Sequence, residues 1–467
     1  MHSDLVGHEN SGTAWSRAAG ERFAAVEEAL RASVRAEGVP GASAAVLEGN
    51  QWLSASYGID DLTTGRVRDE SSRQHTSCMN KVLIAYVALM LVDRKLVALD
   101  EPLSTLLPEA VRRRDGRIVD ITLRQLLSHT SGIDESIEEW APDVAMDAAL
   151  SVRRFENYSQ LAEPGEIVAY SDAGTAIAAL LIERLLGKPW RRAVNELLLG
   201  PLDIKPIPEV DDFEEYYEGA VAAGHRWDEP SGSFQPVPPE APSALADSLG
   251  ERSACLTLGE VATLAQFALD DGVTRDGRRL LSAELAREMR KRQAPFPRHH
   301  LIHSWGLGWL HFDEESFGFE ASWLGHQSFV QIFPEERLAL VVLVNTYPGL
   351  VVYYDVLRAV TGRGQPWQDR PAPPVDAELC VGTYSSDGDR LIITPGAKHL
   401  RYQFFERVSK DEWRHMESGD LVPSGTGGFA GRLGNRIRPG TISPIWSGDG
   451  PKPKFFRFGQ RVVRRIS

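Results

Sequence analysis

The chain has 467 residues, of which 42% are hydrophobic and 25% are charged, so it can build two or three domains with buried cores and is not a disordered protein. Its formal net charge of −14 argues against nucleic acid or an anionic membrane as the main partner. The three cysteines, Cys78, Cys255 and Cys380, are too few and too widely spaced to indicate a disulfide framework or a metal site, and no cofactor is expected.

The N-terminal residues 1–19 form a polar extension without the apolar core of a signal peptide. The longest apolar run, residues 82–92, is too short to cross a bilayer and predicts a buried helix. We therefore expect a soluble, cytoplasmic protein that does not bind membranes.

Helical periodicity over residues 20–37 ends at Pro40 and Gly41. Residues 41–61 then alternate like a β-hairpin whose turn is Gly49-Asn50.

From Lys81 to about Gly272 the pattern is mainly helical, with apolar stripes in three later segments, 121–129, 173–187 and 258–272. Strand-like runs return at 304–312, 328–336 and 338–346, and a last helix follows near 350–361. This order predicts one α+β domain, residues 20–361, with a helical lobe at about 82–300. Its sheet joins segments far apart in sequence, an arrangement that commonly borders a ligand cleft.

Residues 362–376 are rich in Gly and Pro and are typical of a linker. Short strands and turns fill residues 377–467, which predicts a separate small all-β barrel domain.

Cys78 and Lys81 stand at the start of the apolar run. A helix places residues i and i+3 on one face, and its N-terminus carries partial positive charge. Both the helix end and the ammonium favour a thiolate, which is the nucleophile of acyl transfer. A cysteine at the head of a buried helix is, however, more often a packing residue, and the pair alone does not decide between the two readings.

The rest of the sequence favours a reactive Cys78 over a packing residue. Segments along nearly the whole chain match one family in order: "GVPGASAAVLEGN", "SCMNKVLIAYVALMLV", "ITLRQLLSHTSGI", "EPGEIVAYSDAGTAIAALLIERLLGKPW" and "WGLGW". They resemble the serine β-lactamase and penicillin-binding-protein superfamily, in its class C-like branch of esterases, D-aminopeptidases, transacylases and peptide cyclases. The resemblance implies a β-lactamase-like α/β sandwich with a large helical insertion and a lipocalin-like C-terminal barrel.

The first two motifs of the family are changed here. Cys78 stands where the family has its nucleophilic Ser, and it is either natural or a substitution that slows turnover. The second motif ends in Asp172 in place of the usual Asn, and Tyr170 keeps the position of the residue that moves protons to and from the reacting groups. Asp172 either favours a protonated Lys81 or caps the helix predicted to start at Ala173.

The third motif lacks the cation of the family and corresponds to Phe319, Glu320 and Ala321, so efficient β-lactam hydrolysis is not expected. Backbone N–H groups of Cys78 and Ser322 correspond to the oxyanion hole of the family. Phe319, Glu320 and Trp323 are candidate substrate-binding residues. A different register would put His326 in the motif instead.

The sequence therefore predicts an acyl-transfer enzyme that forms a thioester at Cys78, with Lys81, Tyr170 and Ser322 as the other catalytic residues. The substrate would be a small-molecule or peptide ester, thioester or amide, possibly presented on a carrier, and the enzyme a transacylase, peptide cyclase or hydrolase. The alternatives are a catalytically silent binding protein and a serine hydrolase of this family with a Ser-to-Cys substitution.

Overall fold

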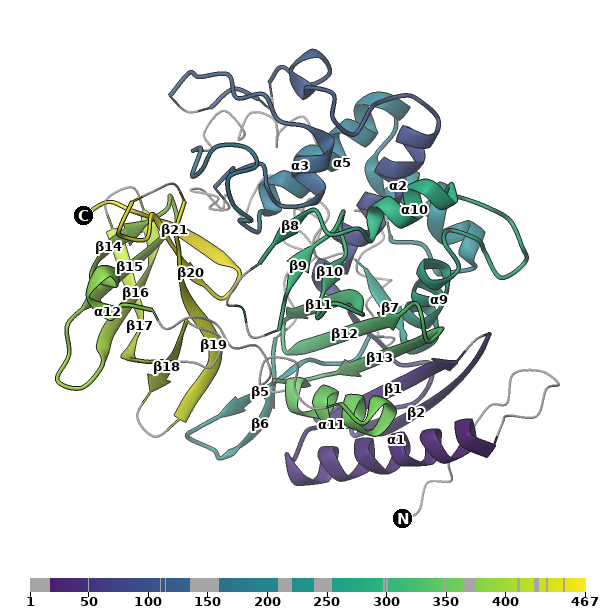
Figure 1. The fold of residues 1–467 in the computed structure, drawn as a ribbon. Coiled ribbons are helices and arrows are strands. Elements are labelled where there is room, and N and C mark those ends of the chain that lie inside the picture. The colour runs from purple at the N-terminus through teal and green to yellow at the C-terminus, as the bar shows by residue number, and fades with distance from the viewer. Residues whose placement is uncertain are drawn as a thin grey trace. The chain divides into compact units, whose positions relative to one another are not determined.

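A computed structural model of the chain divides it into two compact units, Met1–Leu96 with Ile182–Arg290 and Trp309–Gln365, and Val97–Leu181 with Lys291–Gly308 and Pro366–Ser467. Each unit is described by itself (Figure 1). The structure describes residues 17–48, 50–109, 111–113, 115–134, 159–208, 221–238, 254–296, 299, 301–347, 349–363, 375–409, 412–423, 428–433, 436–447 and 450–467.

An antiparallel sheet forms the centre of the first unit. The first long strand pairs with the last, since Ala42 lies opposite Val344 and Glu48 opposite Leu338, so the predicted joining of distant segments is confirmed. The strands follow the order β3-β2-β1-β13-β12-β11-β10, with the bounds β1 Gly41–Glu48, β2 Gln51–Asp61, β3 Arg66–Val67, β10 Leu310–His311, β11 Phe317–Trp323, β12 His326–Phe333 and β13 Leu338–Val344.

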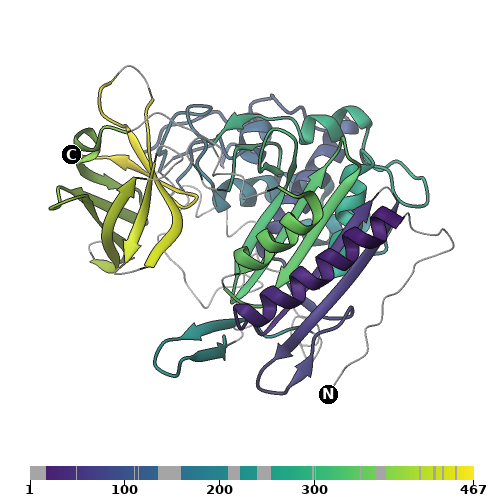
Figure 2. The same cartoon turned by 60° about the horizontal axis from the view of Figure 1, so that its bottom comes forward.

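Helices cover both faces of this sheet, which is why β1 and β13 are apolar almost throughout. α1 (Arg17–Ala36) and α11 (Gly349–Thr361) lie side by side on one face (Figure 2), and the Ser33 hydroxyl joins them by donating to Asp355 at 3.0 Å. α9 (Leu258–Leu269) packs against β1, β12 and β13 on the other face.

The first unit also contains the buried helix α2 (Asn80–Asp93), in which every residue from Asn80 to Leu91 is buried, as the apolar run predicts. Several smaller elements complete the unit. They are η1 Ser77–Met79, α6 Trp190–Val194, η3 Asn195–Leu199, η4 Gly200–Leu202, α10 Ala283–Met289, β4 Arg73–His75 paired with β7 Cys255–Thr257, and β5 His225–Asp228 paired with β6 Ser233–Pro236.

The second unit contains short elements before its barrel. These are η2 Leu103–Thr105, α3 Leu123–Leu127, the first part of α5 Asp172–Leu186, the paired strands β8 Ala294–Pro295 and β9 Ser304–Trp305, and α12 Ala377–Cys380. The strand-like run 304–312 thus holds only two-residue strands, and α12 was not predicted.

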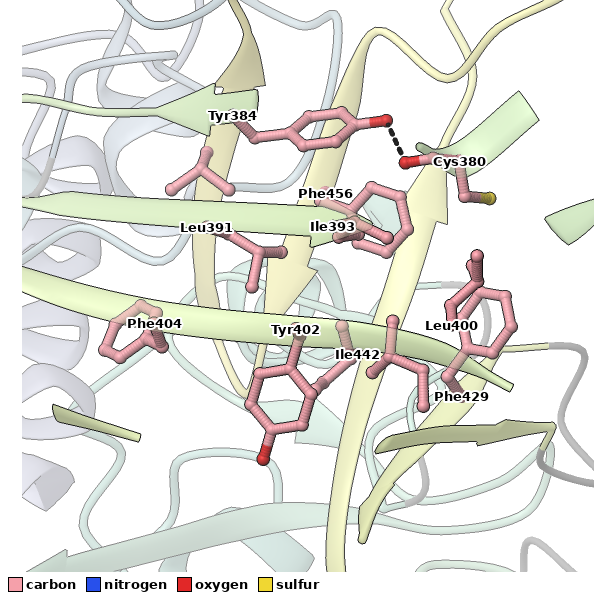
Figure 3. Packing of buried hydrophobic residues seen from close by; sticks show 12 residues of the cluster. Cys380, Tyr384, Leu391, Ile393, Leu400, Tyr402, Phe404, Phe429, Ile442 and Phe456 are labelled. Carbon is pink, nitrogen blue, oxygen red and sulfur yellow. Dashed lines mark hydrogen bonds between the residues drawn. The ribbon is translucent and has the colours of Figure 1, made fainter. Parts of the chain in front are cut away.

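A closed barrel ends the chain, as the sequence predicts. β14 (Gly382–Ser385) pairs with β21 (Arg461–Arg465) and closes it. Alternate side chains of each strand point inward, including Leu391 and Ile393, and Tyr384 donates a hydrogen bond to the Cys380 carbonyl (Figure 3). The other strands are β15 Asp389–Thr394, β16 Leu400–Ser409, β17 Glu412–Pro423, β18 Phe429–Leu433, β19 Arg436–Ile445 and β20 Phe455–Phe458.

Much of the predicted N-terminal extension (1–19) and of the linker (362–376) lies outside the described residues, and the predicted domain bounds stay a prediction. Within the described part of the chain, we find no helix that is both long and apolar enough to span a membrane.

Candidate active site

Cys78 lies in a strained turn immediately before α2. Ser77 adopts φ +51°, a conformation that costs a non-glycine residue about 1 kcal/mol or more. The Ser77 hydroxyl donates to Cys78 Sγ at 3.5 Å, and both the N–H and the hydroxyl of Thr76 donate to the Ala254 carbonyl at 3.0 Å. Cys78 is partly exposed, whereas Cys255 and Cys380 are buried. The local backbone therefore presents a single accessible thiol.

Lys81 follows Cys78 by three residues, in the first turn of α2. It is only 3% exposed, although a lysine is rarely buried so deeply without a specific role. Because η1 runs directly into α2, Cys78 and Lys81 are one helical turn apart along the chain, as predicted.

A buried polar network fixes the strand that leads to this turn. Arg68 donates to Asp60 at 3.0 Å, to Ser43 at 2.8 Å and to Gln74 on β4 at 2.8 Å. Gln74 in turn donates to the Gln327 carbonyl of β12 at 3.0 Å. The network ties β4 to the sheet four residues before Cys78, and no sequence motif indicated it.

β11 lies against η1, so the predicted third-motif residues are beside the Cys78 turn. Strand alternation puts Glu320 and Ser322 on one face of β11. Phe319, which is 1% exposed, lies on the opposite face with Trp323. The structure thus separates the two aromatic candidates from Glu320 and Ser322.

His326 is not on β11, and the alternative register is wrong. Trp323 pairs directly with His326 across the turn Leu324-Gly325, so His326 begins β12. Its ring is buried and its Nε2–H donates to the Ala222 carbonyl at 3.1 Å. Burial, with the nearby His75, holds the pKa of His326 well below its usual value. These features give it a structural role.

Tyr347 joins this group although the sequence analysis missed it. It lies between β13 and α11, and the Ser322 side chain and the Gly325 backbone are near enough to its phenol to act on its pKa, which both lower. Burial of the phenol end raises the pKa of Tyr347, although 40% of the residue stays exposed, and negative charge on Glu320 and Cys78 adds to the rise. The first unit therefore brings Cys78, Glu320, Ser322 and Tyr347 together. No motif could have indicated Tyr347, because its role depends on the pairing of β11, β12 and β13.

Glu320 is an unusual carboxyl for this position. Burial raises its pKa to about 7, so that near neutral pH it exchanges between an acid that donates and a carboxylate that accepts. Carboxyls with such values are enriched at functional sites. The position predicted for the third motif therefore holds a titrating acid.

Tyr170 and Asp172 belong to the second unit. The Tyr170 ring, 8% exposed, packs against His129 at 4.7 Å and Trp305 at 5.9 Å between ring centroids. His129 holds the backbone on both sides of Tyr170, because its carbonyl accepts from the Ala169 N–H at 2.9 Å and its Nδ1 accepts from the Ser171 N–H at 3.2 Å. His129 thus fixes the backbone position of Tyr170.

The helix that follows Tyr170 starts one residue earlier than predicted. α5 begins at Asp172, and the Ser171 hydroxyl accepts from the Gly174 N–H at 3.1 Å, which is the geometry of an N-cap. Ser171 therefore occupies the capping position predicted for Asp172, and Asp172 places a negative charge in the first turn.

Comparisons with known proteins agree with this fold. The family model "Beta-lactamase" matches residues 23–361. Penicillin-binding protein 4 of Amycolatopsis lactamdurans is 28% identical over 75% of this chain and 94% of its own length. Esterase EstB of Burkholderia gladioli is 30% identical over 41% of this chain and 53% of its own length, and a monacolin J acid methylbutanoyltransferase of Aspergillus terreus is 29% identical over 40% and 52%.

Among solved structures, SurE superposes with a TM-score of 0.75 at 22% identity, covering 96% of this chain and 100% of that protein. This likeness shows the fold, including the predicted β-lactamase-like architecture with its C-terminal barrel. The chain thus belongs to the Beta-lactamase family and is an enzyme of this family of hydrolases and acyltransferases.

Proposed function

We propose that the chain is an acyl-transfer enzyme that forms a covalent thioester at Cys78. The observation that carries this proposal is the setting of Cys78, which is partly exposed on a positive-φ turn, accepts a hydrogen bond from Ser77 and precedes the buried Lys81. A hydrogen bond donor to the sulfur and a lysine one helical turn away are features of reactive cysteines. A packing cysteine would need neither the strain nor the exposure.

In the first step, Cys78 Sγ attacks the carbonyl carbon of the acyl donor while Lys81 balances the charge of the thiolate. The oxyanion of the tetrahedral intermediate accepts hydrogen bonds from the N–H groups of Cys78 and Ser322. The bond to the leaving group then breaks, the leaving group takes a proton from Tyr170, and the acyl group remains on sulfur. The role of Tyr170 rests on its place in the family motif.

In the second step, an acceptor amine, alcohol or water gives its proton to Tyr170 and attacks the thioester carbon. Collapse of the second intermediate breaks the C–S bond and restores the thiolate. Thioesters react with amines more readily than with water, so we assign transfer to an amine, as in a transacylase or peptide cyclase, ahead of hydrolysis. The methylbutanoyltransferase among the relatives supports transfer within this family.

Glu320, at the position predicted for the third motif, limits the acyl donors that the site can bind. Where relatives with the usual motif place a cation that helps to bind a substrate carboxylate, an acidic side chain repels it once ionised. The donor is therefore an ester, thioester or amide without a free carboxylate at this position, and efficient β-lactam hydrolysis is not expected.

Intact-protein mass spectrometry tests the proposal directly. We expect p-nitrophenyl esters or an acyl-thioester to add one acyl mass to the wild type and none to Cys78→Ala. The absence of an adduct across several acyl groups would favour a binding protein. Cys78→Ser separates the remaining alternative, because a natural cysteine enzyme loses turnover in this variant, whereas a serine hydrolase carrying a substitution gains it sharply.

A further inference from the structure

The stretch from Ser159 to Ser171, which carries Tyr170, has almost no regular secondary structure, with one isolated bridge at Gln160. Its position must therefore come from other parts of the second unit. His129 holds one side of it, as described above. The barrel holds the rest, through contacts with several residues in the run that leads to Tyr170.

Glu166 makes the first of these contacts. Its Oε1 accepts hydrogen bonds from Ser447 Oγ and from Lys454 Nζ, both at 2.5 Å, on the connection between β19 and β20. Burial by itself would raise the pKa of Glu166, but the hydrogen bonds from Lys454 and Ser447 outweigh it and hold the pKa below its usual value. Glu166 is therefore ionised at neutral pH, and the pair is a charged hydrogen bond.

Arg457 makes the second contact. It lies on β20, is 1% exposed, and donates through Nη2 to the Val168 carbonyl at 3.2 Å. Its guanidinium carbon lies 3.5 Å from the centre of the Phe296 ring, which is a cation–π geometry. The bond is made to backbone, two residues before Tyr170, so it fixes the path of the main chain.

An apolar cluster fills the space between these polar contacts. Four of its residues come from the segment before Tyr170 and three come from β19, β20 and β21 of the barrel, and all seven are buried: Leu161, Ala162, Ile167, Ala169, Ile445, Phe455 and Val462. Ile167 and Ala169 thus pack against the barrel on either side of Val168, whose carbonyl Arg457 binds.

A last contact anchors the beginning of the stretch. Asp387, in the turn between β14 and β15, accepts from the Ser159 N–H at 3.2 Å through its side chain, and its own N–H donates to Asp134 at 2.8 Å. The barrel therefore contacts the stretch at both ends and in its middle.

From these contacts we infer that the barrel is a positioning element for Tyr170, and that Lys454 and Arg457 are positioning residues which set the place of its hydroxyl during acyl transfer. Each acts through the backbone of residues 166–169, without touching the reacting atoms. The inference rests on the proposed role of Tyr170 as proton carrier. Small displacements of such a group are sufficient to lower a rate strongly.

Lys454→Met tests the inference without disturbing the core, because Lys454 is partly exposed. Arg461→Met is the matched control, since Arg461 is also partly exposed and its ion pairs, at 3.0 Å to Asp389 and 3.3 Å to Glu406, join strands of the barrel to one another. A p-nitrophenyl ester releases p-nitrophenolate, which leaves as the anion and takes no proton from Tyr170. An amine acceptor must lose a proton, which Tyr170 accepts while its own proton passes to solvent. We therefore expect Lys454→Met to keep the acylation burst and to lower kcat for transfer to an amine about tenfold, with KM unchanged.

Lys454→Arg should restore most of this loss, and Arg461→Met should match the wild type. Equal kcat for Lys454→Met and Arg461→Met, or loss of the burst together with transfer, overturns the inference. A wild type that forms no adduct contradicts the proposed function instead. In that case amide hydrogen exchange still tests whether Lys454 holds the segment before Tyr170. We expect exchange at residues 166–171 to be faster in Lys454→Met than in the wild type, and unchanged in Arg461→Met.

Discussion

The segment that presents Cys78 and the segment that presents Tyr170 are held in place by different means. Cys78 lies immediately before the buried helix α2, and the chain that leads to it is tied by Gln74 to β12 and by Thr76 to the Ala254 carbonyl. Tyr170 stands at the end of an extended stretch that depends on a turn at His129 and on a barrel almost 300 residues away in sequence. The Cys78 turn is thus fixed by contacts within the first unit, whereas the Tyr170 segment depends on contacts within the second unit that come from distant parts of the sequence.

Replacing Lys81 should have the largest effect on the Cys78 side. Lys81→Met keeps the length and apolar stem of the side chain and removes its charge, so we expect kcat/KM to fall about 100-fold while the fold persists. The rate of adduct formation by mass spectrometry measures it. Lys95→Met, at an exposed position just after α2, is the control. A loss of less than threefold in Lys81→Met would show that the thiolate does not depend on the lysine.

Glu320 makes the Cys78 side sensitive to pH. Its pKa in the folded protein, about 7, is above that of an unfolded glutamate, so between about pH 4.5 and 7 the folded state binds more protons and stability falls as the pH rises. Glu320→Gln removes this loss. We expect the variant to be about 2 kcal/mol more stable than the wild type at pH 8 and equal to it near pH 4, because the carboxyl keeps some contact with water.

Urea denaturation at pH 5 and pH 8 measures this difference. Glu335→Gln, an exposed position on the turn after β12, provides the control and should show no such dependence. If the difference in unfolding free energy between Glu320→Gln and the wild type does not grow with pH, ionisation of Glu320 does not destabilise the folded protein.

Removal of a helix cap should have a smaller effect, and the effect should differ between α5, which follows Tyr170, and α10 in the first unit. Ser171→Ala removes the cap of α5 and should cost about 1 kcal/mol of local stability, measured by amide exchange in the first turn of that helix. Ser282→Ala removes the matching cap of α10 in the first unit, where Ser282 accepts from the Leu285 N–H at 3.4 Å. We expect only Ser171→Ala to lower the rate of amine transfer as well. Equal kinetics in the two variants would mean that the Tyr170 segment tolerates loosening.

Ser77 should have the smallest effect. Ser77→Ala keeps the strained backbone and removes the donor to sulfur, so we expect adduct formation to slow about threefold. Ser77→Gly removes the donor and the strain together, and should be more stable than Ser77→Ala. If Ser77→Ala reacts as fast as the wild type, the hydrogen bond contributes nothing to the reactivity of Cys78.

The parts of the molecule that follow from local patterns could be predicted. Alternation gave the hairpin of β1 and β2, the apolar run gave α2, and the short strands of residues 377–467 gave the barrel. The Cys78–Lys81 spacing follows from helix geometry alone. Tyr347, Arg68 and the Glu166–Lys454 pair could not be found in this way. Tyr347 depends on the register of β11, β12 and β13. Arg68 bonds to Ser43, 25 residues away, and Lys454 bonds to a residue 288 positions away.

The unequal exposure of the three cysteines has a practical consequence. Cys255 and Cys380 are enclosed by packed side chains, while Cys78 is open to solvent. A maleimide or iodoacetamide should therefore label the native protein once and the denatured protein three times. Titration with such a reagent counts competent molecules in any preparation, and protection of that one thiol by a candidate donor reveals occupancy without a turnover assay.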